Sequence, residues 1–133
     1  MNDCLFAYGT LLAPELLAVV LGIPGPSGRP AKLRDYACFK VRNAAYPAII
    51  YREACATQGR VFAGISPDLW SRLDRFESSL YKREIVTLEL ANHEFIEAQT
   101  YVLSDDSHGR LTNESWDLET FRCHHLKKYL ALR

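Results

Sequence analysis

The sequence lacks both the charge pattern of a nucleic-acid-binding protein and the long apolar run of a membrane protein. Its 16 Lys and Arg residues balance its 16 Asp and Glu residues, and no run of like charge occurs. A basic surface that binds phosphates is therefore not expected. The longest mostly apolar stretch, residues 11–23, contains Pro14 and Glu15 and is too short to cross a bilayer. We expect no nucleic-acid partner and no membrane partner.

The chain also lacks the usual marks of secretion and of metal binding. Residues 1–3 read Met-Asn-Asp, without the basic region of a signal peptide. None of the four cysteines belongs to a C-x-x-C pair, and their spacing matches no zinc site. No two of the four histidines lie four residues apart, as a helical metal pair requires. The sequence predicts a cytoplasmic protein with free thiols, no metal and no cofactor.

The composition is that of an ordinary folded protein. Hydrophobic residues make up 48% and charged residues 24% of the 133 residues, which argues against disorder. A chain of this length buries roughly two thirds of the surface that its unfolded state exposes. No repeat, linker or low-complexity segment divides it. We expect a single domain over residues 1–133.

Apolar runs and alternating apolar and polar residues predict about six short strands. They are expected at residues 4–8, 31–41 (one or two strands with a bend near Asp35), 48–51, 59–65, 82–90 and 95–103. Residues 92–94 form the turn that joins the last two strands into an antiparallel hairpin. Residues 53–58 read as a polar turn, and residues 104–112 as a polar, mobile loop.

About three helices are expected among these strands. Pro14 opens the first helix and Gly22 ends it. Ser66 caps the second helix, and Ser115 caps the last, whose buried side includes Leu132. Strands and helices at separate places define an α+β fold. We expect a small mixed β-barrel-like sheet flanked by about three helices, with a cavity at one end.

The second helix carries a glutamate within its apolar arc. At roughly 100° per residue, one face of this helix is formed by Leu69, Leu73, Phe76 and Leu80. Glu77 lies about 40° from Leu73, between Leu73 and Trp70, rather than opposite them. A carboxylate facing a core costs free energy unless it is paired or protonated. Glu77 is therefore either a hydrogen-bonded structural residue or a group with a shifted pKa that faces a cavity.

A short turn follows the first strand and precedes the first helix. It consists of Tyr8, Gly9, Thr10 and Leu11. Backbone N–H groups released by such a turn can bind an anion. An ordinary strand-to-helix turn would have the same appearance, so the four residues alone do not decide between the two interpretations.

Four motifs occur in a fixed order along the chain. They are residues 6–11 (FAYGTL), 46–49 (YPAI), 59–62 (GRVF) and 73–77 (LDRFE), the last followed by Tyr81 and Arg83. This series resembles the γ-glutamylcyclotransferase-like family, including its small bacterial and plant members, over residues 4–101. The resemblance implies a compact mixed β-barrel flanked by helices.

The resemblance also implies an activity and a set of site residues. The enzyme would release 5-oxoproline and a free amine or amino acid from a γ-glutamyl amide or peptide. Glu77 matches the family's acid/base carboxylate, and Tyr81 matches an aromatic residue that lines the cavity. The substrate loop, whose backbone amides hold the α-carboxylate, is matched by Tyr8, Gly9, Thr10 and Leu11. The partner would be a small-molecule γ-glutamyl substrate, and the protein a monomer or weak homodimer.

This chemistry needs a base but no nucleophilic side chain. The α-amine of the substrate attacks its own γ-carbonyl, so nucleophile and electrophile are already tethered. A carboxylate at the edge of an apolar face has the raised pKa that suits the base. The alternatives are a non-catalytic small-molecule-binding domain of the same fold and a purely structural domain. No cysteine stands beside a recognisable base, which disfavours a Cys hydrolase.

Three points about the site stay open. The sequence does not identify the leaving amine. Asp74, at the edge of the apolar arc, is expected to face water rather than to orient the site. The region after Leu103 is a candidate determinant of specificity.

Overall fold

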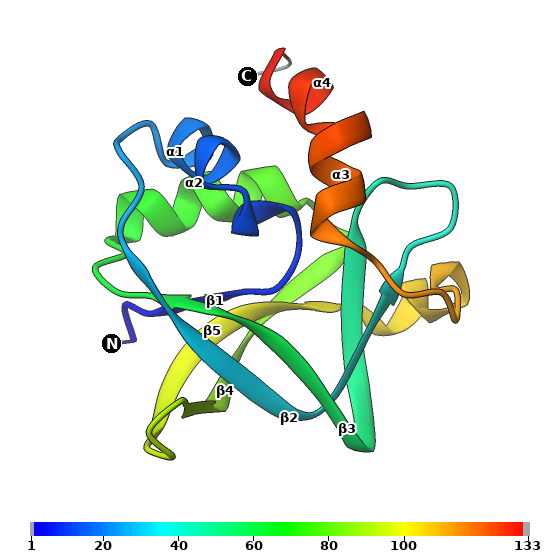
Figure 1. The fold of residues 1–133 in the computed structure, drawn as a ribbon, viewed down its shortest axis with the longest axis horizontal. Helices are drawn as coiled ribbons and strands as arrows, with labels where there is room; N and C mark the ends of the chain where they lie inside the picture. Colours follow the sequence, from blue (N-terminus) through cyan, green and yellow to red (C-terminus); the bar gives the residue numbers. More distant parts are fainter. Residues whose placement is uncertain (1, 132–133) are drawn as a thin grey trace.

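The computed structural model describes residues 2–131, and its helices gather on one side of a five-stranded sheet (Figure 1). The strands are β1 (Leu5–Ala7), β2 (Gly28–Lys40), β3 (Pro47–Phe62), β4 (Tyr81–Leu90) and β5 (Phe95–Leu103). The α-helices are α1 (Pro14–Leu21), α2 (Pro67–Glu77), α3 (Leu118–His124) and α4 (Leu126–Ala131). Two 3-10 helices, η1 (Thr10–Leu12) and η2 (Asp105–Arg110), complete the described elements.

The strands form a closed barrel in the order β1-β3-β2-β4-β5. β1 closes the barrel because it pairs antiparallel with β3 and parallel with β5, where Leu5 lies opposite Gln99. The predicted hairpin of β4 and β5 is confirmed over its whole length. The sheet is therefore mixed and closed, as expected. Its interior is filled by a cluster of buried side chains that includes Phe6, Leu33, Ile49, Leu88 and Ala98.

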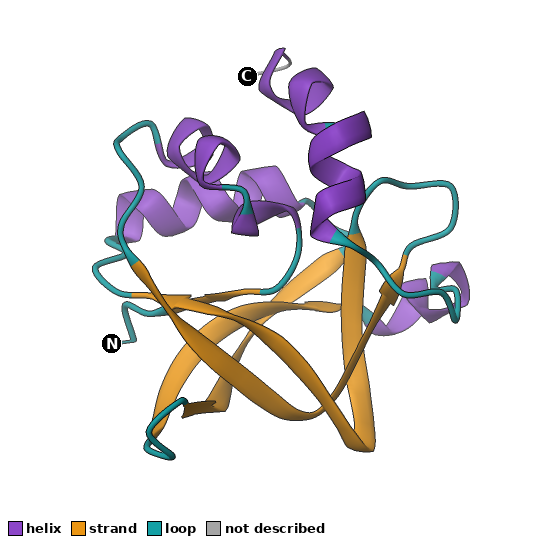
Figure 2. Ribbon diagram, in the orientation of Figure 1, coloured by secondary structure: helices purple, strands orange, loops and turns teal. Residues whose placement is uncertain are grey.

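The helices cover one side of the barrel and enclose a second core (Figure 2). Pro14 stands at the start of α1, and Gly22 ends this helix in the left-handed conformation with φ of 74°. The Ser66 hydroxyl accepts a hydrogen bond from the Leu69 N–H and caps α2, as predicted. The second core includes the fully buried side chains of Leu16, Leu73 and Phe121.

β3 is one continuous strand, which corrects the prediction of two strands separated by a turn at residues 53–58. β2 and β3 pair along almost their whole length, with a register shift between Arg34 and Tyr36. At the shift, Asp35 has φ of 67° and its carboxylate accepts a hydrogen bond from the Ala54 N–H at 3.1 Å. This confirms the bend near Asp35. Residues 51–54 are exposed, and consecutive exposed positions in a strand give the polar pattern of a turn.

The C-terminal region differs from expectation in two ways. Residues 105–110 form η2 rather than a loop, and the last helix is divided into α3 and α4 at His125. The N-cap of α3 is Asp117 rather than Ser115, because the Asp117 carboxylate accepts a hydrogen bond from the Thr120 N–H at 2.9 Å. Within residues 2–131, four α-helices therefore replace the three expected. Leu132 lies outside the described residues.

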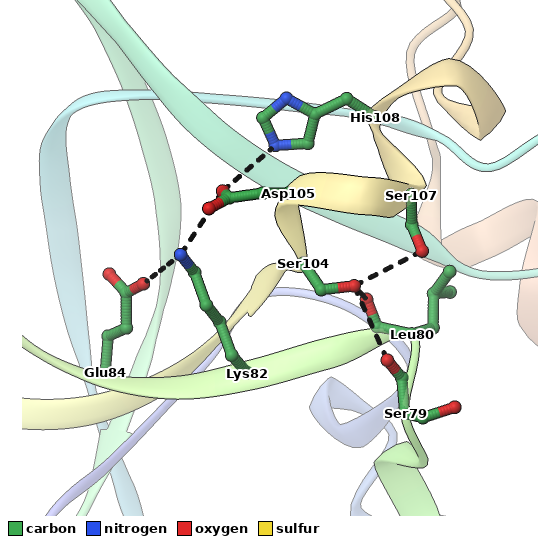
Figure 3. Close-up of polar contacts among 8 residues, drawn as sticks. All are labelled: Ser79, Leu80, Lys82, Glu84, Ser104, Asp105, Ser107 and His108. Atoms are coloured by element: carbon green, nitrogen blue, oxygen red, sulfur yellow. Dashed lines mark hydrogen bonds and ion pairs between the residues drawn. The ribbon is translucent and has the colours of Figure 1, made fainter.

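Figure 3 shows how η2 is held beside the start of β4. The Lys82 ammonium lies 3.0 Å from a Glu84 carboxylate oxygen and 3.3 Å from one of Asp105. The Ser104 hydroxyl donates a hydrogen bond of 2.9 Å to the Leu80 carbonyl oxygen. The Ser104 hydrogen bond holds Leu80, in the segment that joins α2 to β4, and Leu80 borders the site described next.

No helix within residues 2–131 has the length and apolarity needed to span a membrane. Over the same residues, no three His, Cys, Asp or Glu side chains gather as a metal site would require. The four cysteines, Cys4, Cys38, Cys55 and Cys123, are free thiols.

Candidate functional site

A cavity of about 310 Å³ opens where the end of β1, the end of α2 and the start of β4 meet. The sequence predicts six site residues in three separate segments of the chain. The structure brings all of them to the wall of this cavity: Tyr8, Gly9, Thr10, Leu11, Glu77 and Tyr81. Closure of the barrel brings the first and third of these segments together, because β1 and β4 both pair with β5.

The loop after β1 presents backbone N–H groups beside the cavity. It turns through η1, in which the Leu12 N–H donates to the Gly9 carbonyl at 2.9 Å. Within residues 2–131, the N–H groups of Gly9, Thr10 and Leu11 donate to no protein acceptor. Glycine is required at position 9, because a Cβ there would lie 2.9 Å from the Pro47 ring. The loop can therefore offer these N–H groups to an anion.

Glu77 ends α2 with its carboxyl group recessed in the cavity. The side chain is half-buried, and no Lys, Arg or His among residues 2–131 forms an ion pair with it. Burial raises the pKa of Glu77 from 4.5 to about 8, because the charged form loses hydration without gaining a cation. A carboxyl group with this pKa can both accept and donate a proton near neutral pH.

Three tyrosine hydroxyls donate hydrogen bonds that hold the cavity wall together. The Tyr8 hydroxyl donates to the Tyr101 carbonyl oxygen, and the Tyr81 hydroxyl donates to the Pro47 carbonyl oxygen, both at 2.6 Å. The Tyr101 hydroxyl donates to the Asp74 carboxylate at 2.6 Å. Burial raises the pKa of each phenol above its usual value, so all three stay protonated. They act as hydrogen-bond donors that join the barrel strands to one another and to α2.

Asp74 is exposed to water, as expected, but it also makes two contacts that the sequence did not predict. Its side chain is 46% exposed, yet Oδ1 accepts the Tyr101 hydrogen bond and lies 3.1 Å from Nη1 of Arg83. The Arg83 guanidinium lies over the Trp70 ring, 4.7 Å from its centroid. Asp74 therefore ties α2, three residues before Glu77, to β4 and β5.

Several residues of the cavity wall were not predicted as site residues from the sequence. Tyr101 and Phe76 stand in a strand and a helix, where an aromatic residue is most often part of a core. Tyr46 and Pro47 belong to one of the four motifs but indicated only the start of a strand. Tyr129 of α4 is another. No local pattern shows that these residues share a cavity, because the fold brings them together across more than 80 positions, from Tyr46 to Tyr129.

The fold is shared with solved γ-glutamyl cyclotransferases. A structure described as a gamma-glutamyl cyclotransferase superposes with a TM-score of 0.67 over 78% of this chain and 68% of that chain, at 17% identity. Two solution structures of Arabidopsis thaliana proteins superpose with TM-scores of 0.75 and 0.76, at 28% and 26% identity. The first covers 99% of this chain and 79% of that chain, and the second 98% and 87%.

Sequence comparison gives the family. Residues 5–118 match the family described as gamma-glutamyl cyclotransferase, AIG2-like, and the chain belongs to it. Two curated Arabidopsis thaliana relatives are Protein AIG2 C and AIG2-like protein D. The first is 30% identical over 94% of this chain and 75% of its own length. The second is 31% identical over 96% of this chain and 84% of its own length. The family predicted from the four motifs is confirmed.

Proposed function

We propose that this protein cyclises γ-glutamyl amides, releasing 5-oxoproline and a free amine or amino acid. Family membership and fold support a γ-glutamyl cyclotransferase-like enzyme in general. The specific reaction is supported by one observation above all. A half-buried glutamate, Glu77, whose pKa is raised to about 8, shares a cavity with a loop whose backbone N–H groups donate to no protein acceptor within residues 2–131.

Glu77 is proposed as the acid/base residue. The ionised carboxylate takes a proton from the α-ammonium of the substrate, and the amine formed attacks the γ-carbonyl carbon. The ring C–N bond forms, and the original amide C–N bond breaks as the leaving nitrogen receives the proton held by Glu77. The second proton of the ring nitrogen passes to the released amine, which leaves as an ammonium ion. Glu77 ends the cycle as it began.

The remaining groups are proposed to hold the substrate in its cyclising conformation. The N–H groups of Gly9, Thr10 and Leu11 would bind the α-carboxylate. Tyr8 and Tyr81 would form rigid walls, since their hydroxyls are already bound to carbonyl oxygens. Restricting a tethered amine and carbonyl to a reactive geometry supplies much of the rate enhancement, without a metal or a covalent intermediate.

The test is release of 5-oxoproline from a panel of γ-glutamyl amides by the wild-type protein and by Glu77→Gln. Glutamine keeps the size of the side chain but cannot carry the proton. We expect turnover of at least one panel member by the wild-type protein and a loss of about 10²-fold or more in Glu77→Gln. Saturable binding of the amides without any product would instead identify a non-catalytic binding domain. Equal turnover by both proteins would refute the role of Glu77.

A further inference from the structure

The C-terminal helices bring an aromatic ring to the cavity from outside the region that matches the family. That region ends at residue 118, whereas Tyr129 lies on α4. The Tyr129 ring meets the fully buried Phe121 ring edge-on, with the centroids 5.1 Å apart. Phe121 also packs against Trp116, at 6.0 Å between centroids. A buried aromatic cluster therefore supports Tyr129 at the cavity wall.

Two more rings reach the cavity from other elements. Tyr46 precedes β3 and Tyr81 begins β4, with their ring centroids 6.4 Å apart and their planes at 57°. The loop before Tyr46 is fixed because the Trp116 indole N–H donates to the Ala45 carbonyl oxygen at 2.8 Å. The Tyr81 hydroxyl is held by the Pro47 carbonyl oxygen. The rings are thus held in place before any ligand enters, which lowers the entropy lost on binding.

The proposed reaction assigns the other parts of the cavity. The α-carboxylate occupies the loop after β1, and the reacting amine and carbonyl lie beside Glu77. What is left for the leaving group is the aromatic part of the wall, formed by Tyr46, Tyr81 and Tyr129. A volume of about 310 Å³ lies at the lower end of the range for small-molecule sites, roughly 300–1,000 Å³. Such a space suits a γ-glutamyl group with one compact substituent rather than a long peptide.

We propose that the preferred substrate is a γ-glutamyl amide whose leaving amine carries a single flat aromatic ring, which packs among Tyr46, Tyr81 and Tyr129. This proposal rests on the proposed function and specifies its substrate class. Aromatic pairs gain from ring geometry beyond the area they bury, which corresponds to roughly 2- to 10-fold in affinity or kcat/KM. Tyr46 and Tyr129 are then determinants of specificity, while Glu77 carries the chemistry.

Two substrates of similar size isolate the contribution of the ring faces. γ-Glutamyl benzylamide and γ-glutamyl cyclohexylmethylamide both present a six-membered ring, but only the first ring is flat and aromatic. γ-Glutamyl methylamide reports the chemistry without a ring. We expect the wild-type protein to prefer the benzylamide over the cyclohexyl compound by about 3- to 10-fold in kcat/KM.

Variants then assign the preference to particular residues. Tyr129→Leu and Tyr46→Leu should reduce the benzylamide preference toward one, with less effect on the methylamide. Tyr129→Phe keeps the ring and should keep the preference, which separates ring contact from a loss of folding. Tyr51→Leu is the matched control, because Tyr51 is 65% exposed and lies outside this cavity.

The outcomes separate the inference from the proposed function. Turnover of all three amides with equal kcat/KM for the two ring compounds would overturn the inference and leave the function intact. Preference for a γ-glutamyl amino acid over the benzylamide would overturn it as well. If no amide is cyclised, the proposed function fails. Calorimetric binding of the two ring compounds to Glu77→Gln then decides the inference alone, and equal affinities would overturn it.

Discussion

Two glutamates, Glu77 at the end of α2 and Glu89 near the end of β4, lie in opposite environments. Glu89, near the end of the strand, is 8% exposed and lies 2.7 Å from Arg34 and 3.1 Å from His93. Hydrogen bonds from His93 and Arg34 lower its pKa. Glu77, four residues before the strand begins, has no ion pair among residues 2–131, and burial raises its pKa to about 8.

The difference shows that burial of a carboxylate does not by itself mark a functional residue. Glu89 lies beside Lys32 and Arg34 of β2, whose charges stabilise its ionised form and link β2 to β4. Glu77 lines the cavity, where the proposed reaction places the α-ammonium group of the substrate. The sequence contains acidic residues of both kinds, and only the partners distinguish them.

The largest expected effect tests whether the two glutamates differ in function. Glu77→Gln should lower kcat/KM for 5-oxoproline release by about 10²- to 10⁴-fold, because the proton carrier is lost. Glu89→Gln should stay within about threefold of wild type, since Glu89 does not line the cavity. Circular dichroism of both variants controls for folding. Equal losses of kcat/KM in the two variants would show that the two glutamates do not differ in function.

Substitution of Gly9, in the loop beside the Glu77 cavity, should have the next largest effect on kcat/KM. Gly9→Ala should lower kcat/KM by about 10- to 100-fold, because the new Cβ would lie 2.9 Å from Pro47 and displace the loop. Gly109→Ala is the matched control, because no atom lies within 4 Å of a Cβ built there. Steady-state kinetics of both variants measure the effect. Wild-type kinetics in Gly9→Ala would exclude the loop from substrate binding.

The sequence predicts those parts of the fold that carry a local signal. In the hairpin of β4 and β5, apolar side chains recur at every second position from Val86 to Leu90, and Ser66 and Pro67 mark the start of α2, so both elements were predicted. Residues 53–58 were missed because the buried side chain in this part of β3 is the polar Thr57, so the burial pattern is not visible as a pattern of hydrophobicity.

The site was predicted in part for a similar reason. Glu77 stands out locally as a charge within an apolar arc, and the loop after β1 stands out as a glycine turn. The partners of Asp74 come from β4 and β5, so the helix pattern alone left it facing water. Tyr129 reaches the cavity only through the packing of α3 and α4.

The pH dependence of activity should follow Glu77 and not Glu89. Burial raises the pKa of Glu77 to about 8, and the base must be ionised to accept a proton. kcat/KM should therefore rise about tenfold per pH unit below pH 8 and level off above it. The same inflection is expected in Glu89→Gln. An inflection near 4.5, the usual glutamate value, would show that burial does not shift the pKa of the base.

The stability of Glu77→Gln should exceed that of wild type at alkaline pH. Wild-type Glu77 binds a proton more tightly when folded than when unfolded, so stability falls as pH rises from 4.5 to about 8. Glutamine carries no charge, so the variant does not lose this stability. The unfolding free energy of the variant minus that of wild type should be roughly 2–5 kcal/mol larger at pH 9 than at pH 4. Urea unfolding at both pH values measures this. A constant difference between the two proteins would contradict it.

Glu89→Gln should show the opposite and smaller trend. The folded-state pKa of Glu89 is lowered, so its contribution to stability is present above the pKa of the unfolded state and is lost as pH falls. We expect a slightly lower Tm than wild type at pH 7, with the difference closing at acid pH. A Tm difference that grows on acidification would show that the cations around Glu89 do not stabilise it.

The most direct measurement is the titration of the Glu77 carboxyl carbon by ¹³C NMR, assigned by its absence in Glu77→Gln. A carboxyl group buried without a cation should titrate near pH 8, far above the usual glutamate range. The Glu89 carbon, in the same spectra, should titrate below its usual value. A Glu77 titration near 4.5 would contradict the account, because the proposed base would then be an ordinary, solvated carboxylate.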